Sequence, residues 1–101
     1  FHLKLSNEIA KDMIRSSPLC ISQKNKGVAY AYVIYEDFNF PIPVDKNCNS
    51  IKDVKAHHNS ITNIVRLILN NMGVRKPFAI DYQSKLHIDG NLYVICNIIT
   101  N

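Results

Sequence analysis

Two stretches of the sequence, residues 28–35 and 92–99, are apolar on both of the faces that a β-strand would present. The first is an uninterrupted apolar run, and the second contains no charged residue. A strand of this kind belongs inside a sheet that is covered on both sides, because an open apolar edge pairs with other chains. We therefore expect both stretches to be internal strands, or the second to pair with another chain across an interface.

The segment after the first of these strands is predicted to be an edge strand. Glu36 and Asp37 mark a turn. The return stretch then alternates apolar residues with polar ones or prolines: Phe38, Asn39, Phe40, Pro41, Ile42, Pro43 and Val44. Proline has no N–H to donate to a neighbouring strand, so two prolines place residues 38–44 at the edge of the sheet.

A long helix is predicted between Ser50, its N-cap, and Gly73, where it ends. Its apolar stripe recurs at spacings of three and four: Ile51, Val54, His58, Ile61, Val65, Ile68 and Met72. Ser60 is an alternative N-cap, in which case the helix breaks near His57 and His58 and runs only from Ile61. We expect the second half to pack more deeply, because further apolar residues widen its face: Ile64, Leu67 and Leu69.

The region after Pro77 predicts an amphipathic strand that returns through a tight turn. One predicted face carries the apolar residues Phe78, Ile80, Tyr82, Leu86 and Ile88, and the other carries Asp81, Gln83, Lys85 and His87. Asp89-Gly90 is a dipeptide that favours a two-residue hairpin turn. It would join this strand to the uncharged stretch 92–99.

These elements predict one α+β domain over residues 1–101, cut from a longer protein. A short strand over 1–5, a helix over 7–15 and a short strand over 19–21 are expected before the first long strand. The expected order is α-β-β-α-β-β, with an antiparallel sheet of four to five strands packed against one long helix and one short N-terminal helix. β-grasp, ferredoxin-like and kinetochore-type folds all fit this order.

Composition narrows the setting of the domain. The 101 residues carry a net charge of +4 and three cysteines, Cys20, Cys48 and Cys96. An odd number of cysteines at irregular spacing favours reduced thiols in an intracellular protein of the cytoplasm or nucleus. No apolar run approaches the roughly 20 residues that cross a bilayer, so no membrane association is expected. The abundance of Ile, Asn and Lys is typical of an AT-rich genome.

No motif predicts catalysis, a cofactor or a metal site. His57 and His58 are adjacent, and neighbouring residues on a helix point about 100° apart, so they are not expected to bind one ion. Asp81, Gln83 and Lys85 share one face of the predicted strand and are faintly similar to the acidic and lysine residues of metal-dependent nucleases. Alternating polar residues occur on any half-exposed strand, so the nuclease is a distant alternative and no enzyme is expected.

The predicted function is a non-enzymatic protein–protein interaction or oligomerisation domain of a larger intracellular protein. It would act through a sheet edge or through the exposed flank of the long helix. Two helices are few for covering both faces of the sheet, which is the main reason to expect a protein partner. The partner-binding residues expected are Phe38, Phe40, Ile42, Leu92, Val94 and Ile98. The alternative is nucleic-acid binding by basic turns through Lys24, Lys26, Arg75 and Lys76.

Overall fold

A computed structural model describes Asp12, residues 29–88 and residues 90–100 of the chain. The strands predicted over 1–5 and 19–21 lie outside the described residues, as do Cys20, Lys24 and Lys26. Of the predicted N-terminal helix, only Asp12 is described.

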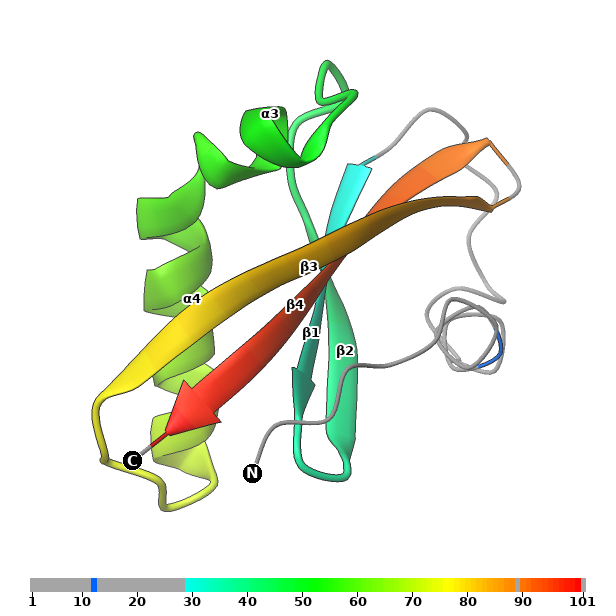
Figure 1. Cartoon of the computed structure of the whole chain (residues 1–101). Helices are drawn as coiled ribbons and strands as arrows, with labels where there is room; N and C mark the ends of the chain where they lie inside the picture. The colour runs from blue at the N-terminus through cyan, green and yellow to red at the C-terminus, as the bar shows by residue number, and fades with distance from the viewer. Residues whose placement is uncertain (1–11, 13–28, 89, 101) are drawn as a thin grey trace.

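The described chain forms four strands and two helices (Figure 1). In chain order they are β1 (Ala29–Tyr35), β2 (Phe38–Pro43), α3 (Ile51–Lys55), α4 (His58–Asn71), β3 (Phe78–Ile88) and β4 (Asn91–Thr100). The strand order in the sheet is β2-β1-β4-β3. The two strands with two apolar faces, β1 and β4, are therefore the central ones, as the sequence predicts.

The sheet is mixed, so the prediction of a wholly antiparallel sheet is wrong. β1 and β2 form one antiparallel hairpin, β3 and β4 form another, and β1 lies parallel to β4. The reason is the path of α4, which carries the chain back across the sheet so that β3 runs in the direction of β2. The result is an α+β fold in which two hairpins meet through a parallel central pair, with the two helices between them in the chain.

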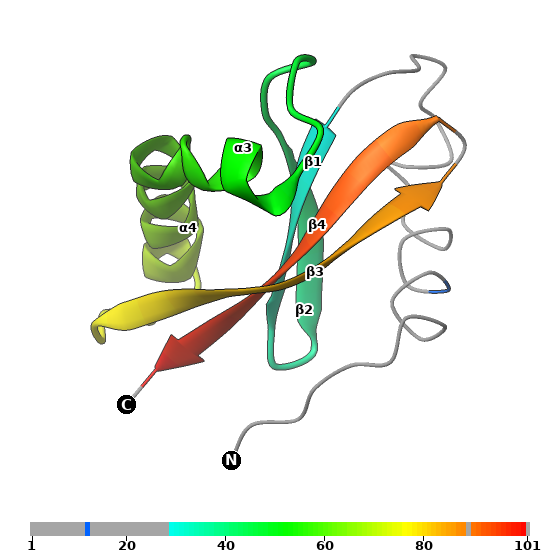
Figure 2. The same cartoon turned by 45° about the horizontal axis from the view of Figure 1, so that its top comes forward.

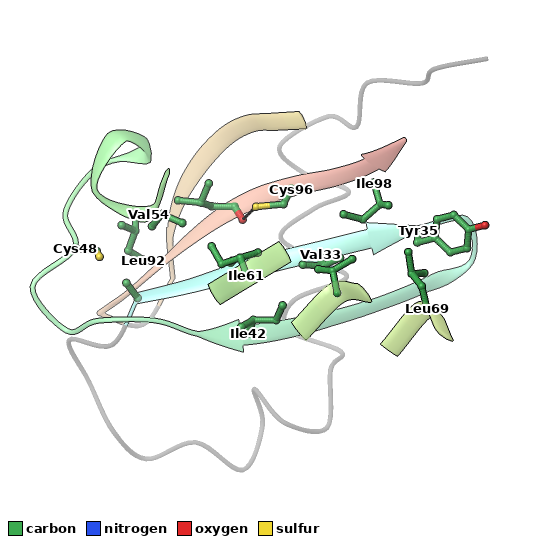
Figure 3. Packing of buried hydrophobic residues seen from close by; sticks show 14 residues of the cluster. Val33, Tyr35, Ile42, Cys48, Val54, Ile61, Leu69, Leu92, Cys96 and Ile98 are labelled. Atoms are coloured by element: carbon green, nitrogen blue, oxygen red, sulfur yellow. Dashed lines mark hydrogen bonds between the residues drawn. The ribbon is translucent and has the colours of Figure 1, made fainter. Parts of the chain in front are cut away.

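One face of the sheet, called the first face below, is covered by both described helices (Figure 2). The core between the sheet and these helices combines residues of β1, β2, β4, α3 and α4 (Figure 3). Its fully buried members include Val33, Val54, Ile61, Val65, Val94 and Cys96. Leu69 of α4 points toward the sheet near Tyr35 at the end of β1.

The opposite face of the sheet, the second face, carries a separate apolar cluster. Its members are Tyr30, Tyr32, Ile34, Leu86, Ile88, Tyr93 and Ile95. The rings of Tyr30 and Tyr93 stack with their centroids 5.1 Å apart. These side chains are buried within the single chain, although neither described helix lies on this face. The prediction that β1 and β4 are buried on both faces is confirmed.

A β-bulge divides β3 and changes which residues share a face. Tyr82 pairs with Cys96 and Ser84 pairs with Ile95, so Gln83 is an extra residue inserted into the ladder. An extra residue inverts the alternation of side chains beyond it. Phe78, Ile80 and Tyr82 therefore belong to the first face, whereas Leu86 and Ile88 belong to the second. The prediction that all five apolar residues share one face is wrong.

The prolines of β2 sit at the positions that face away from β1. The Val44 N–H donates to the Ala29 carbonyl at 2.9 Å. Hydrogen-bonding direction alternates along an antiparallel pair, so Asn39, Pro41 and Pro43 turn their backbone groups away from β1. The expected edge strand is confirmed, and Asn39 supplies the only outward N–H of β2.

The predicted long helix is two helices. Ser50 caps α3, accepting a hydrogen bond from the Asp53 N–H at 3.2 Å. α3 ends at Lys55 and α4 begins at His58, so the alternative break near His57 is confirmed. The second helix starts before Ile61, because the Ile61 N–H already donates to the His57 carbonyl at 3.0 Å.

Candidate interaction surfaces

The structure separates the predicted partner-binding residues into buried and accessible ones. Leu92, Val94 and Ile98 lie in the first-face core, and Ile42 is also buried. Because β4 is internal to the sheet, these three residues of β4 are not presented to a partner. Phe38, by contrast, is 41% exposed, and its ring centroid lies 5.2 Å from that of half-buried Phe40. Of the predicted set, these two aromatic residues of β2 offer an accessible apolar surface.

The side of α4 opposite the sheet carries exposed apolar residues, and its one cation, Arg66, lies at the border of this side. Ile64 is 40% exposed and Leu67 is 63% exposed. Their neighbours on that side are amides and a hydroxyl: Ser60, Asn63 and Asn71. Arg66 is the only charged residue of this 14-residue helix. We call Ser60, Asn63, Ile64, Leu67 and Asn71 the uncharged flank of α4.

Contacts with β3 show which way this flank faces. His58 Nδ1 lies 2.8 Å from the Tyr82 hydroxyl, and the Arg66 guanidinium lies 5.9 Å from the centre of the Phe78 ring. Ile64 is two residues from Arg66, which is about 200° around a helix. The uncharged flank therefore faces away from β3, on the side of α4 opposite its buried residues Ile61, Val65 and Leu69.

The sequence prediction that Ile64 and Leu67 pack against the sheet is wrong. Leu67 is two residues from both Val65 and Leu69, which are buried, so it lies on the opposite side of the helix. A helical wheel restricted to residues 58–71 separates Leu67 from the buried stripe. Apolar character alone does not distinguish Leu67 from the buried residues, because it takes no account of the angular position of each residue around the helix.

A second surface is a pocket of about 420 Å³ where α4 turns into β3. Its lining includes three cations, Arg66, Arg75 and Lys76, and no acidic residue. The rest of the lining is an amide and apolar side chains: Leu69, Asn70, Val74, Pro77 and Phe78. We call this the basic pocket. It contains Arg75 and Lys76 from the predicted nucleic-acid site and adds Arg66, which the sequence did not single out.

The turn that forms the basic pocket closes the end of α4 with its own backbone. The Val74 N–H donates to the Leu69 carbonyl at 2.8 Å, and the Gly73 N–H donates to the Asn70 carbonyl at 3.0 Å. Gly73 has a φ of +84°, the left-handed conformation that glycine adopts without strain. The last carbonyls of α4 therefore have partners, and the cations that follow are not needed to bind them.

The arrangement similar to a nuclease is not formed. Asp81 pairs with Asn97 and Lys85 pairs with Val94, and these two β4 residues point to opposite faces of the sheet. Asp81 and Lys85 are therefore separated by the bulge. In the part of the chain that the structure describes, no three metal-ligating side chains come together.

The histidine pair has a structural connection to β3. His58 is exposed rather than part of the apolar stripe, and Thr62 Oγ1 lies 3.3 Å from its Nε2. Burial raises the pKa of Tyr82, the other partner of His58, to about 12. His58 therefore links the first turns of α4 to a tyrosine that stays protonated.

Cys48 and Cys96 are free thiols and both are buried. Burial, with a smaller contribution from Asp81, raises the pKa of Cys96 to about 12. Burial is also the main cause that raises the pKa of Cys48, with Asp45 and Asp53 adding to it. Both thiols therefore stay protonated near neutral pH, which makes them weak nucleophiles and weak metal ligands.

Comparison with known proteins gives no match among family models, curated proteins or solved structures. Among the described residues, no helix is long and apolar enough to cross a membrane.

Proposed function

We propose that this chain is a non-enzymatic protein-binding domain that self-associates through the uncharged flank of α4. The observation that carries the proposal is the exposure of Ile64 and Leu67 on this uncharged flank. A surface helix usually presents charged residues to water. Exposed apolar residues rimmed by polar ones are typical of a surface that another protein covers.

A second copy of the chain is the occupant that fits this flank. Identical surfaces that meet face to face repel each other when they carry charge, and the chain has a net charge of +4. The uncharged flank avoids this repulsion. Asn71 offers both donors and an acceptor, so its amide can bond with the same group of another copy. The Asn63 amide keeps its two N–H donors, since its Oδ1 accepts from Arg66.

The size of the flank predicts weak association. α4 has 14 residues and is therefore about 21 Å long. The surface area on one side of such a helix is well below the roughly 800 Å² that each partner buries in a standard stable interface. We expect a reversible dimer with a Kd in the micromolar to millimolar range, roughly 4 to 8 kcal/mol.

Association by strand addition at β2 is less favoured. The outward edge of β2 lacks two of its three N–H donors because Pro41 and Pro43 occupy those positions. Side-chain contact through α4 is independent of these backbone groups.

The test measures solution mass by light scattering over a concentration series at low and high salt. We expect the mass of the parent chain to rise with concentration in both, because the surface is apolar and salt screens only charge. Ile64→Lys should keep the chain monomeric by placing like charges across the interface. Ile99→Lys is the matched control, because Ile99 has the same exposed fraction of 40% and lies on β4.

The measurement has two outcomes that contradict the proposal. A strict monomer at every concentration would exclude self-association and leave a different protein as the partner. Equal masses for Ile64→Lys and the parent chain, with association still present, would place the interface elsewhere on the molecule.

A further inference from the structure

The basic pocket concentrates positive charge that the described structure does not neutralise. Arg66, Arg75 and Lys76 line one hollow of about 420 Å³ without an acidic residue. Arg66 donates a hydrogen bond to Asn63 Oδ1 at 3.1 Å, and it makes no ion pair with any described residue. Three cations that line a single pocket repel one another, and an anion bound between them would relieve that repulsion.

The dipole of α4 does not explain why three cations line the basic pocket. The C-terminal end of an α-helix behaves as roughly half a negative charge. The carbonyls of Leu69 and Asn70 already accept hydrogen bonds from Val74 and Gly73. Three cations exceed what this helix end requires, so most of their charge is available to a ligand.

The remaining lining limits what kind of anion fits. Leu69, Val74, Pro77 and Phe78 make an apolar wall, which an inorganic anion would leave uncovered. The Arg66 guanidinium lies over the Phe78 ring, and its flat surface can stack on a planar ring such as a nucleobase. A volume of 420 Å³ lies in the usual range for small-ligand sites.

We propose that the basic pocket binds a phosphorylated nucleoside, with Arg75 and Lys76 on the phosphate and the base against Arg66, Phe78 and the apolar wall. Guanidinium groups match phosphate oxygens in a two-pronged geometry, and lysine adds a point charge. A free nucleotide and a nucleotide within a single strand share this chemistry. The site lies on the β3 side of α4, so the proposal does not depend on self-association through the uncharged flank.

The test is calorimetric titration of the full chain with four probes: adenosine monophosphate, a single-stranded oligothymidylate, inorganic phosphate and a hexaglutamate peptide. We expect the nucleotide, the strand or both to bind, and phosphate and hexaglutamate to bind at least ten-fold more weakly. Binding of the monophosphate alone assigns a free nucleotide, and binding of the strand alone assigns a single-stranded nucleic acid. Equal affinity for hexaglutamate or for inorganic phosphate would overturn the proposal, as would no binding of either nucleotide probe.

A pair of double variants separates the pocket from general positive charge. Arg75→Gln with Lys76→Gln should weaken nucleotide or strand binding at least ten-fold. Lys46→Gln with Lys52→Gln removes the same charge from exposed residues before and within α3, outside the pocket lining, and should change affinity less than two-fold. An equal loss in the two double variants would overturn the site.

The salt dependence of binding gives a second test for the single-stranded oligothymidylate. The two phosphate-neutralising cations, Arg75 and Lys76, predict a slope of about −1.4 in log K against log salt, or roughly 7-fold weaker binding at 200 mM than at 50 mM. The Arg75 and Lys76 double variant removes both of these contacts and should reduce the slope to near zero. An unchanged slope would show that these residues do not contact the strand.

Discussion

Deleting Gln83 tests the division of β3 directly. Gln83 is the extra residue between Tyr82, which pairs with Cys96, and Ser84, which pairs with Ile95. Without it, Ser84 follows Tyr82 in a regular ladder, and every other residue of β3 keeps its partner and its face. The deletion removes the hydrogen bond that the Gln83 amide donates to Asp81, which is long at 3.4 Å. We expect the free energy of unfolding to fall by about 1 kcal/mol or less.

If the side chains of residues 78–88 alternated without interruption, the Gln83 deletion would lower the free energy of unfolding by more. In that case the deletion would move Leu86 and Ile88 to the opposite face. These side chains are 6% and 4% exposed, and each contributes roughly 1.5 to 3 kcal/mol by its burial. The loss would be about 3 to 6 kcal/mol, a large part of the ~5 to 15 kcal/mol that holds a small domain together.

Urea unfolding followed by far-UV circular dichroism distinguishes the two cases. Deletion of His87 is the control, because every alignment of the shortened strand turns either Leu86 or Ile88 to the first face. The His87 deletion should cost at least about 1.5 kcal/mol. A Gln83 deletion that costs about 3 kcal/mol or more, or as much as the His87 deletion, would refute the bulge argument.

Two further predictions concern single side chains. Tyr82→Phe removes the hydroxyl that lies 2.8 Å from His58 Nδ1, and it should cost about 1 kcal/mol in urea unfolding, because the bond is partly exposed to water. A change below about 0.3 kcal/mol would show that the His58 link is not stabilising. The pKa of Cys96 is raised to about 12 from an ordinary value of 9.0, so its contribution to stability is complete below pH 9 and is lost as pH rises toward 12. Cys96→Ala should therefore make the fall in unfolding free energy between about pH 9 and pH 11 less steep, by up to about 1.4 kcal/mol per pH unit. Equal slopes in the parent chain and in Cys96→Ala would contradict this.

The sequence predicted the elements whose residue pattern is local and strong. The strands with two apolar faces that became β1 and β4, the proline edge of β2 and the Ser50 cap all follow from residue type at a fixed spacing. The direction of β4 relative to β1 was not predictable in this way, because it depends on the route of α4 across the sheet. The bulge at Gln83 was also missed, since one extra residue leaves the apolar pattern of β3 looking regular.

The candidate sites were predicted in part. Phe38, Arg75 and Lys76 were singled out from the sequence and lie on accessible surfaces. A binding site is often apolar, and so are Leu92, Val94 and Ile98. Their position in a central strand of the sheet, however, buries them. Arg66 joins Arg75 and Lys76 only through the fold, because the turn after α4 brings them to one pocket.

The parallel pairing of β1 with β4 has a consequence for how the chain reaches its native state. Each hairpin closes over a few residues, whereas Ala29 pairs with Leu92 across a loop of about 60 residues. Each doubling of loop length costs about 0.6 kcal/mol in entropy, so this closure is about 3 kcal/mol less favourable than that of a two-residue turn. Both hairpins therefore form early and repeatedly, and folding waits for the rarer event in which their inner strands meet. Until then, the most apolar strand edges of the molecule stay open, and this is the stage at which the chain is most exposed to aggregation.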